Sequence, residues 1–431
     1  MNKKLGEYRG AGVEAGEAGS GGFSLRGLRT FDSFKVPVFR LYFGIMAGHW
    51  ISTNMQMVTR SLLIYRLTES GAILGVMSLA NAIPMITLSL LGGAMADRIQ
   101  KKFVLLAGQA ASSVLALGIA LALTLGYLSK DVPGSWWILI ASAVVQGSIM
   151  GLMMPSRQAI IPEIVGPERL MNAISLNTLG MNMFQILAPA AAGFLIDIFD
   201  FNVIYFITTG LYSLAAIGVF FLPRFKTTPV QGSGTLHEVL DGVRYVRREK
   251  TILLVLVFVL VCTVFGMPHR MLMPMFTEDI LKVGGTGLGL LMSVSGIGAL
   301  VSSSTLASLP NRKRGRLLLI GGLILGFALL GFAFSRWWFL SLFLMFMVGL
   351  GDTGQRALGN TLIQYHVDAQ YRGRVMSFFM MSFGLGSLGT FFGGLLAEAA
   401  GVQWSIGGLA IALTVVALLI LSLSPRLRKL E

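Results

Sequence analysis

The sequence predicts an all-α membrane protein in which twelve transmembrane helices form two six-helix bundles related by an internal repeat. The first observation is composition: 54% of the 431 residues are hydrophobic and 13% are charged, against about 25% charged in soluble domains. A soluble protein of this length would lack the charge to cover its surface, and a chain this apolar does not stay disordered. The other two observations are the spacing of the apolar segments and a repeat between the halves of the chain.

Twelve apolar segments reach the roughly 20 residues that a helix needs to cross the hydrocarbon core. In chain order they are 39–63, 71–96, 103–128, 136–158, 170–196, 201–223, 251–276, 286–309, 316–335, 337–364, 373–398 and 402–424. Most connections are short, whereas the polar stretch 224–250 is longer. The expected organisation is a flexible cytoplasmic N-terminal tail without a secretory signal, two bundles, a cytoplasmic linker and a C-terminal tail, at 1–37, 38–223, 224–250, 251–424 and 425–431.

The distribution of Lys and Arg predicts the orientation of the chain. The two tails and the loops after even-numbered segments, counted with the segment ends beside them, hold 27 of the 34 Lys and Arg residues, and the opposite loops hold four. The remaining three, Arg60, Arg270 and Arg356, fall inside segments. We therefore expect a multi-pass protein of the plasma (inner) membrane with both termini in the cytoplasm. The net charge of +14 is then mainly an orientation signal, and the basic loops lack the interleaved aromatic residues of nucleic-acid binders.

The two halves resemble each other at two fixed offsets. At an offset of 214, Gly75 corresponds to Gly289, and at an offset of 201 the segment 188–197 corresponds to 389–398. Both matches keep the same direction across the membrane. They predict a parallel repeat about an axis along the membrane normal, with a binding site near the midplane between the halves.

Residues 93–102, Gly-Ala-Met-Ala-Asp-Arg-Ile-Gln-Lys-Lys, resemble the loop 2–3 signature of the major facilitator superfamily, G-x-x-x-D-R-x-G-R-K. Segments 40–41, 55–56, 155–159, 242–246 and 372–377 look like the branch that contains the enterobactin exporter and macrolide efflux proteins. Segment 188–193 is similar to the fifth-helix motif of the superfamily's antiporters. The resemblance implies the superfamily fold, in which helices 1, 4, 7 and 10 line a central cavity, and a proton-linked exporter. It does not name the substrate.

The loop signature has a physical interpretation as a cytoplasmic gate. The residues assigned to it are Gly93, Asp97, Arg98, Lys101, Lys102 and Arg157. A glycine one turn before Asp97 allows a neighbouring helix to approach closely. The carboxylate can pair with an arginine or a helix N-terminus in one state and release it in another. The alternative is a plain orientation signal, which explains the lysines but not Asp97.

Asp352 is the only carboxylate deep inside a predicted helix, and Arg356 lies four residues later on the same face. A charge at the bilayer centre costs about 2.5–3.5 kcal/mol even on mild scales, so such residues usually mark a pathway. One interpretation makes Asp352 a proton or cation carrier tuned by Arg356. The other is a permanent structural ion pair that opposes protonation. His49 is a second candidate for ion coupling, and its alternative is a hydrogen-bonded packing residue.

Polar side chains at helical spacing predict which helix faces contact a substrate. On the first helix, one face carries His49, Thr53, Gln56 and Arg60. We expect this stripe to face the central cavity, because a polar stripe facing lipid is costly. Further polar candidates on helices 4, 5, 7 and 10 are Gln146, Ser175, Thr178, Asn182, Gln185, His269, Arg270 and Asn360. The pair at 269–270 either coordinates an anionic group or extends outward to the membrane surface.

The sequence contains a short match to a cofactor-binding motif, but its surroundings exclude such a site. The G-x-G-x-x-G run at 384–389 lies inside an apolar segment instead of after a strand, and no P-loop occurs. The four His and one Cys lack zinc spacing, and Cys262 has no partner for an internal disulfide. We therefore expect no cofactor, no metal and no enzymatic activity.

The sequence predicts a proton-coupled exporter of a small amphipathic molecule, working by rocking of two bundles about a central cavity. The apolar surface, the many Met residues and the three arginines within the spans favour an amphipathic molecule, with an anion as one option, such as a siderophore or a hydrophobic drug. Alternatives within transport are an uncoupled facilitator and a lipid or lysolipid translocator. Alternatives from other classes are a transporter-like sensor or partner-binding membrane protein and a membrane enzyme. Expected partners are the substrate, protons and membrane lipids, with the protein a monomer.

Overall fold

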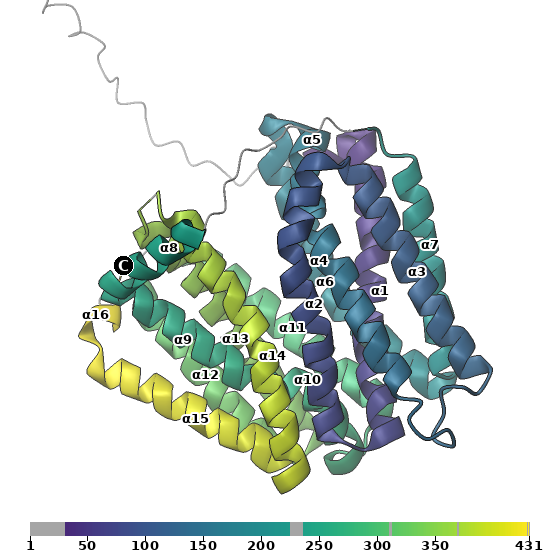
Figure 1. The fold of residues 1–431 in the computed structure, drawn as a ribbon. Coiled ribbons are helices and arrows are strands. Elements are labelled where there is room, and N and C mark those ends of the chain that lie inside the picture. The colour runs from purple at the N-terminus through teal and green to yellow at the C-terminus, as the bar shows by residue number, and fades with distance from the viewer. Residues whose placement is uncertain (1–30, 225–235, 310–312, 369, 429, 431) are drawn as a thin grey trace, which may run out of the picture.

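The computed structural model describes residues 31–224, 236–309, 313–368, 370–428 and 430. Over these ranges the chain is helical and contains no strand (Figure 1). The predicted all-α class is confirmed.

The first half of the chain forms one bundle. Its elements are η2 (Asp32–Lys35), α1 (Pro37–Thr68), α2 (Gly71–Arg98), α3 (Lys101–Thr124), α4 (Trp137–Ala159), α5 (Ile161–Val165), η3 (Pro167–Arg169), α6 (Leu170–Ile198) and α7 (Phe201–Phe220). Local chemistry explains several boundaries. Pro37 begins α1, since its fixed φ suits the first helical turn. The Ser70 hydroxyl accepts a hydrogen bond from the backbone N–H of Ile73 and so caps α2.

The second half forms the other bundle. Its elements are α8 (Leu236–Arg248), α9 (Lys250–Gly266), α10 (Pro268–Met275), the π-helical turn η4 (Phe276–Ile280), α11 (Gly284–Ser308), α12 (Arg314–Phe334), α13 (Trp338–His366), α14 (Arg372–Ala400), α15 (Val402–Leu423) and α16 (Pro425–Arg428). Pro268 lacks a backbone N–H, so the seventh predicted helix is divided there into α9 and α10.

Ten segments of the described chain are long and apolar enough to cross a membrane, with α9, α10 and η4 forming one of them, Lys250–Ile280. α1 and α13, with 32 and 29 residues, have the length but are more polar. Together these elements are consistent with the twelve predicted spans. The chain is a multi-pass membrane protein.

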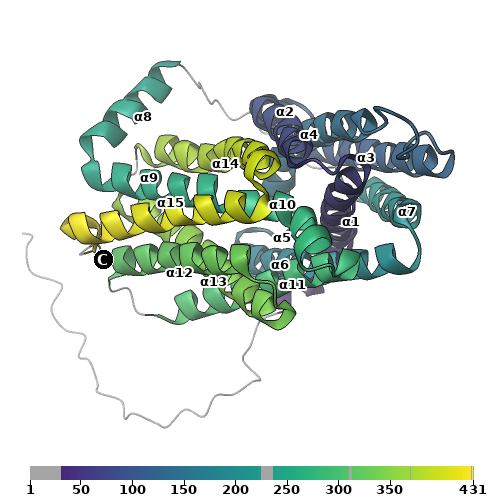
Figure 2. The same cartoon turned by 90° about the horizontal axis from the view of Figure 1, so that it is seen from below.

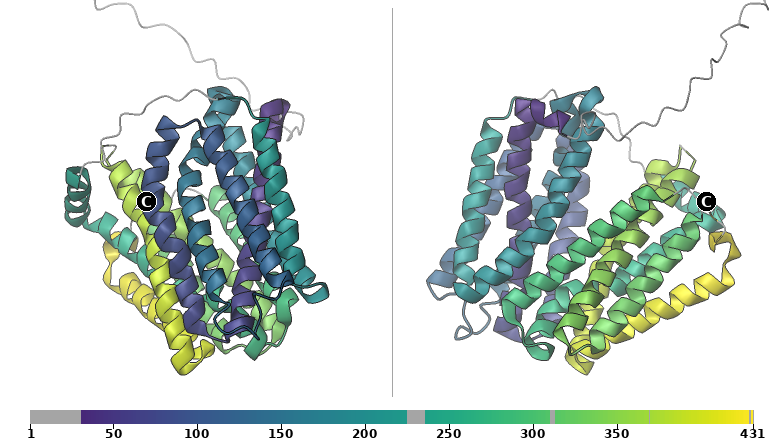
Figure 3. Two further views of the ribbon diagram at one scale, coloured as in Figure 1. Left: turned by 45° about the vertical axis from the view of Figure 1, so that its right-hand side comes forward. Right: turned by 180° about the vertical axis from the view of Figure 1, so that it is seen from behind.

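The two bundles form a wedge. They lean together at the bottom of Figure 1 and spread toward the top, where α5 and α8 lie, and the view from behind in Figure 3 shows the same divergence. Figure 2, seen from below, places α6, α10 and α11 near the junction. We call the spread side, which carries η2 and α16, the terminal side, and the other side the closed side.

Most contacts between the bundles come from two helix pairs, α6 with α11 and α2 with α14. Glycines make the close approach feasible: a Cβ at Gly193 would meet the carbonyl oxygen of Gly285, and a Cβ at Gly394 would meet that of Gly71. Gly193 and Gly394 are 201 residues apart, and Gly71 and Gly285 are 214 residues apart. These are the two offsets of the sequence repeat, so the interface has the predicted parallel pseudo-twofold symmetry.

The connecting segments contain more structure than expected. The predicted linker 224–250 includes the helix α8, where the ring of Tyr245 stacks on Tyr371 with centroids 4.3 Å apart. Residues 225–235 lie outside the described residues, as do residues 1–30 of the predicted flexible tail. The end of that tail forms η2, and Asp32 pairs with Arg169 at 3.1 Å.

Candidate functional site

A cavity of about 270 Å³ lies between the bundles. α1 and α6 of the first bundle and α10, α11 and α13 of the second line it. Its polar lining residues are Asn54, Asn182, Gln185, His269, Arg270, Ser295, Ser303, Asp352, Thr353 and Arg356. Its long apolar side chains are Met57, Met273, Met292, Leu300 and Met345.

A three-residue charge cluster is the main feature of the cavity. Asp352 Oδ2 accepts a hydrogen bond from Arg270 Nη2 at 2.9 Å, and Asp352 Oδ1 lies 2.9 Å from Arg356 Nε in an ion pair. The Asp352 side chain is 6% exposed, whereas those of Arg270 and Arg356 are 33% and 24% exposed. The Arg356 guanidinium also lies over the Phe383 ring, 5.1 Å from its centroid. The expected pairing of Asp352 with Arg356 is present, and Arg270 joins it from a second helix.

The break between α9 and α10 positions Arg270. α10 begins at Pro268, and His269 Nδ1 contacts the carbonyl oxygen of Gly266 across the break. Arg270 on this short helix then points to Asp352 on α13. The alternative that the pair at 269–270 extends outward to the membrane surface is wrong for this conformation, because His269 is buried and Arg270 lines the cavity.

The first bundle contributes neutral polar groups. Asn182 and Gln185 of α6 line the cavity, as predicted from their helical spacing. Ser175 and Thr178 of the same stripe are exposed, and their hydroxyls donate to carbonyls of their own helix. α6 therefore presents only the later part of its predicted stripe to the cavity.

The polar stripe of α1 does not face the cavity, and this expectation is wrong for the conformation described here. His49 contacts Gln109 of α3 at 3.4 Å, Thr53 contacts Tyr212 of α7 at 3.2 Å, and Gln56 donates to Thr208 of α7 at 3.3 Å. Arg60 Nε is buried without a hydrogen-bond partner among the described atoms. Polar groups on neighbouring helices thus contact His49, Thr53 and Gln56 inside the first bundle, in place of the cavity.

Sequence reasoning missed the cavity-facing residues of α1, which are Asn54 and Met57. They lie three positions apart, one position beyond Thr53 and Gln56. The available signal was an amide followed at helical spacing by a Met residue. The neighbouring stripe is more polar, so the prediction favoured that stripe over Asn54 and Met57.

Two other predicted contacts lie away from the cavity lining. Gln146 of α4 is 5% exposed, and both polar atoms of its amide are without a hydrogen-bond partner in the described structure. Asn360 of α13 accepts a hydrogen bond from Gln364 at 2.8 Å. Neither residue is brought to the cluster around Asp352 in this conformation.

Two lysines of the predicted gate, Lys101 and Lys102, make contacts within the first bundle. Lys101 pairs with Glu163 at 2.6 Å, and the Lys102 ammonium donates to the carbonyl oxygens of Phe220 and Leu222. Close helix approach involves Gly92, where a Cβ would meet the backbone of α4, whereas the space around Gly93 is open. The Gly93 expectation is therefore wrong in this conformation. The side chains of Asp97 and Arg98 lie outside the described structure.

Arg157 lies in the last turn of α4. The Tyr42 hydroxyl of α1 donates to its carbonyl oxygen at 3.2 Å. Like the lysines, this part of the predicted gate contacts its own bundle.

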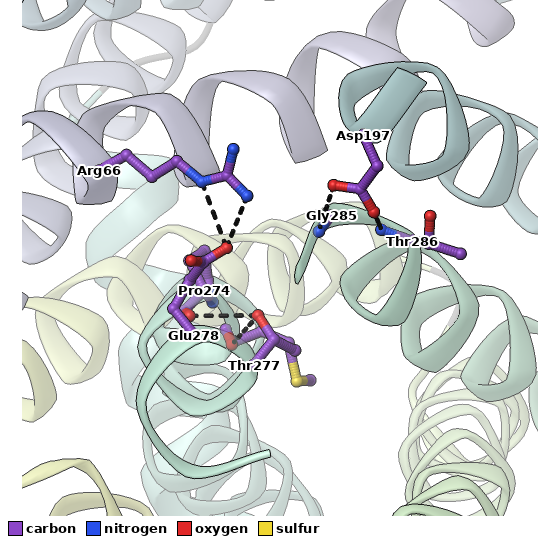
Figure 4. A network of polar contacts seen from close by, with 8 residues as sticks. Arg66, Asp197, Pro274, Thr277, Glu278, Gly285 and Thr286 are labelled. Carbon is purple, nitrogen blue, oxygen red and sulfur yellow. Dashed lines mark hydrogen bonds and ion pairs between the residues drawn. The ribbon is translucent and has the colours of Figure 1, made fainter. Parts of the chain in front are cut away.

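The closed side carries polar contacts between the bundles that sequence reasoning had not assigned. Arg66 of α1 pairs with Glu278 at 2.8 Å, and the Tyr65 hydroxyl donates to Asp279 at 2.5 Å. Glu278 and Asp279 lie in η4, a rare helix type often found at functional sites. Figure 4 shows Arg66 reaching Glu278 from the facing helix.

Two carboxylates on the closed side bind helix N-termini. Asp197, at the end of α6, accepts hydrogen bonds from the backbone N–H groups of Gly285 and Thr286 at 3.0 and 2.7 Å (Figure 4). Glu398, in the last turn of α14, accepts from the Ser70 hydroxyl at 2.6 Å and from the backbone N–H of Ala72 at 3.1 Å. Each carboxylate meets the positive end of a helix of the other bundle. Each of the two repeated segments, 188–197 and 389–398, ends with an acidic residue, and this was the signal in the sequence for these contacts.

No cluster of three or more His, Cys, Asp or Glu residues that could hold a metal ion occurs among the described residues.

Comparison with known proteins places this architecture in a family. The family described as transmembrane secretion effector matches residues 29–431. The chain is 23% identical over 380 residues to the staphyloferrin A transporter of Staphylococcus aureus, covering 85% of this chain and 91% of that protein. It is 26% identical over 315 residues to the multidrug resistance protein MdtG of Salmonella typhi, covering 72% and 73%.

A solved structure supports the fold independently. The structure of the nucleoside transporter NupG superposes with a TM-score of 0.69 at 16% identity, covering 90% of this chain and 99% of that one. Its low identity makes it a likeness of fold alone. On the family match over almost the whole chain, the protein belongs to the transmembrane secretion effector family of major facilitator superfamily transporters.

Proposed function

We propose that this secondary transporter is a proton-coupled exporter of a small amphipathic molecule, and that Asp352 is its protonatable coupling group. The observation that carries the proposal is the charge cluster: a largely buried carboxylate held by two arginines in a cavity between the bundles. A permanent structural pair needs only one partner of opposite charge. Here the second arginine comes from a different helix, so the cluster connects α10 with α13, two of the three elements of the second bundle that line the cavity.

Coupling requires that protonation changes the affinity for substrate or the balance between conformations. A neutral Asp352 no longer holds Arg270 and Arg356, so both guanidiniums become available to other partners. The cavity residues Asn182, Gln185, His269 and Arg270 are proposed substrate contacts. His49, packed against α3, is a weaker candidate for coupling than Asp352.

Alternating access gives the closed-side contacts a role. The Lys and Arg bias supports the terminal side as cytoplasmic, so the conformation described here is spread on the cytoplasmic side. To open outward, the bundles must break the Asp197, Glu398 and Arg66 contacts and meet on the terminal side. The contacts between bundles proposed for Asp97, Arg98, Arg157 and their basic neighbours belong to that second conformation.

Export is supported by the likeness to two relatives, the staphyloferrin A transporter and the multidrug resistance protein MdtG. The amphipathic lining of the cavity fits small molecules of this kind. We further propose that the protein works as a monomer in the plasma membrane.

The experiment is flux from proteoliposomes with an imposed pH gradient, using the cation ethidium and the anion 1-naphthalenesulfonate as reporters. Gradient-dependent flux that is lost in Asp352→Asn supports the proposal. Asp131→Asn, which removes an exposed loop carboxylate, is the matched control. Flux that ignores the gradient and survives Asp352→Asn would identify an uncoupled facilitator. Exchange of lysophosphatidylcholine between leaflets, with neither reporter moving, would identify a lysolipid translocator.

A further inference from the structure

The charges of the cavity do not balance. Among the described residues that line it, Asp352 is the single acid, and Arg270 and Arg356 are permanent cations. His269, whose Nδ1 contacts the Gly266 carbonyl oxygen, adds no permanent charge, because a histidine side chain is mainly neutral at pH 7. With Asp352 ionised the cluster keeps one unit of positive charge, and with Asp352 protonated it keeps two.

The two arginines also have unused hydrogen-bond donors. A guanidinium carries five N–H groups, and a carboxylate offers two oxygens. Asp352 contacts Arg270 through Nη2 and Arg356 through Nε. Both arginine side chains stay about a quarter to a third exposed, at 24% and 33%, although they lie between two bundles. Because both side chains line the cavity and are partly exposed, a ligand in the cavity can reach them.

An apolar wall lies beside the positive group. Met57, Met273, Met292 and Met345 come from four different elements, and Met adapts its shape to ligands of different outline. The remaining polar lining groups, such as Asn54 and Ser295, are neutral. The cavity thus offers one cationic end and one adaptable apolar surface, within about 270 Å³.

We propose that the substrate is an amphipathic anion, whose carboxylate or similar group binds Arg270 and Arg356 while its apolar part lies against the Met residues. A planar carboxylate matches the paired donors of a guanidinium. A cationic substrate would instead have to displace two arginines from Asp352 and enter a site that is already positive. This inference rests on the proposed function, since it specifies the substrate of the same cavity.

The sign of proton coupling follows from the same geometry. The bound anion and ionised Asp352 repel each other and compete for the same guanidiniums, so anion binding favours protonation of Asp352. By linkage, protonation strengthens anion binding by the same factor. Substrate anion and proton therefore cross together and without net charge. Export then follows the outward gradient of an acid produced inside the cell, in contrast to the opposed movement of an antiporter.

Binding to the purified full-length protein tests the substrate class without any transport. The probes are 1-naphthaleneacetate, its neutral amide 1-naphthaleneacetamide and the cation 2-(1-naphthyl)ethylamine, which share a ring system and differ in charge. Calorimetric titration at neutral pH should give an affinity for the anion about tenfold above that for the amide, as expected for a charge-assisted contact. Equal affinities for all three, or a preference for the amine, would overturn the proposal.

Variants assign the effect to the cluster. Arg270→Gln and Arg356→Gln should each remove about tenfold in anion affinity and leave amide binding unchanged, whereas Arg336→Gln in an exposed loop should change neither. Asp352→Asn should bind the anion more tightly than wild type and lose the rise in affinity that wild type shows as pH falls. Arg270→Lys and Arg356→Lys keep the charge and should retain part of the binding, which separates loss of charge from loss of fold. Anion affinity that is unchanged in both Gln variants contradicts the assignment.

The coupling sign is read from proteoliposomes with pyranine inside and an outward gradient of 1-naphthalenesulfonate, which cannot carry a proton itself. If a proton leaves together with each anion, the internal pH should rise. If a proton enters in exchange for each anion, as in antiport, the internal pH should fall. Acidification would overturn the coupling sign but keep the exporter. Selective anion binding without any proton movement would keep the substrate class and refute the coupling role of Asp352 in the proposed function.

Discussion

Asp197 and Glu398 bind equivalent helix N-termini on opposite sides of the interface between the bundles. Asp197 accepts from the backbone N–H of Thr286, and Glu398 accepts from that of Ala72. Ala72 and Thr286 are separated by 214 residues, and the two carboxylates by 201. The internal repeat therefore places the same electrostatic contact twice, each time between an acid of one bundle and a helix dipole of the other.

We predict that Asp197→Asn and Glu398→Gln shift the protein toward its second conformation, in which the bundles separate on the closed side. Each loses a charge–dipole contact of about 1 kcal/mol, which changes the ratio of conformations about fivefold. Spin labels at Val132→Cys and Trp337→Cys, in a Cys262→Ser background, report the distance across the closed side. The two variants should have similar effects because the contacts are equivalent.

The control for these carboxylates is Asp200→Asn. Asp200 caps α7 within the first bundle, through the backbone N–H of Phe201. It should lower stability without moving the label distances. A shift as large as that of Asp197→Asn would show that the label distances respond to general loosening.

Large side chains at the interface glycines should prevent closure on the closed side. A Cβ at Gly193 or Gly394 would meet a backbone carbonyl oxygen of the opposite bundle, so Gly193→Leu and Gly394→Leu should abolish flux while the protein still inserts and elutes as a monodisperse species. Gly408→Leu is the matched control, because no atom lies within 4 Å of a Cβ there. Normal flux in both interface variants would mean that this packing is dispensable.

The charge cluster predicts an unequal effect of its members on stability. Asp352→Ala leaves two arginines without an anion and should cost about 3–5 kcal/mol, as for a broken buried pair. Arg270→Gln leaves Asp352 and Arg356 balanced one to one and should cost about 1 kcal/mol or less. Thermal unfolding in detergent should give the lowest midpoint for Asp352→Ala, with Asp352→Asn between. A lower midpoint for Arg270→Gln than for Asp352→Ala would contradict this account of the cluster.

The Arg66–Glu278 pair should contribute little to stability and more to orientation. Its side chains are 37% and 27% exposed, and exposed pairs are typically worth about 0.2–1 kcal/mol. A double-mutant cycle with Arg66→Gln and Glu278→Gln should give a coupling energy in this range, decreasing as salt is added. The exchanged pair, Arg66→Glu with Glu278→Arg, should recover part of it. A coupling energy of several kcal/mol would indicate a far less solvated contact.

Predictions from the sequence succeeded where one segment carries the information. Hydropathy and length predicted the long helices, and an i, i+4 spacing predicted the contact of Asp352 with Arg356. The offsets of the repeat predicted equivalent interface positions. The stripe on α1 failed because polar side chains avoid lipid in two ways, by facing a cavity or by bonding to neighbouring helices, and spacing along one helix does not distinguish them.

The sequence by itself determined the membrane class, the all-α fold and the two-fold repeat, because apolar length and internal similarity are properties of the chain alone. Only the tertiary structure decided the rotation of each helix about its axis. That rotation brings Arg270 to Asp352 across 82 residues and turns Asn54, instead of Thr53, toward the cavity. Helix rotation depends on packing and hydrogen bonds between helices, and these contacts form between residues far apart in the chain.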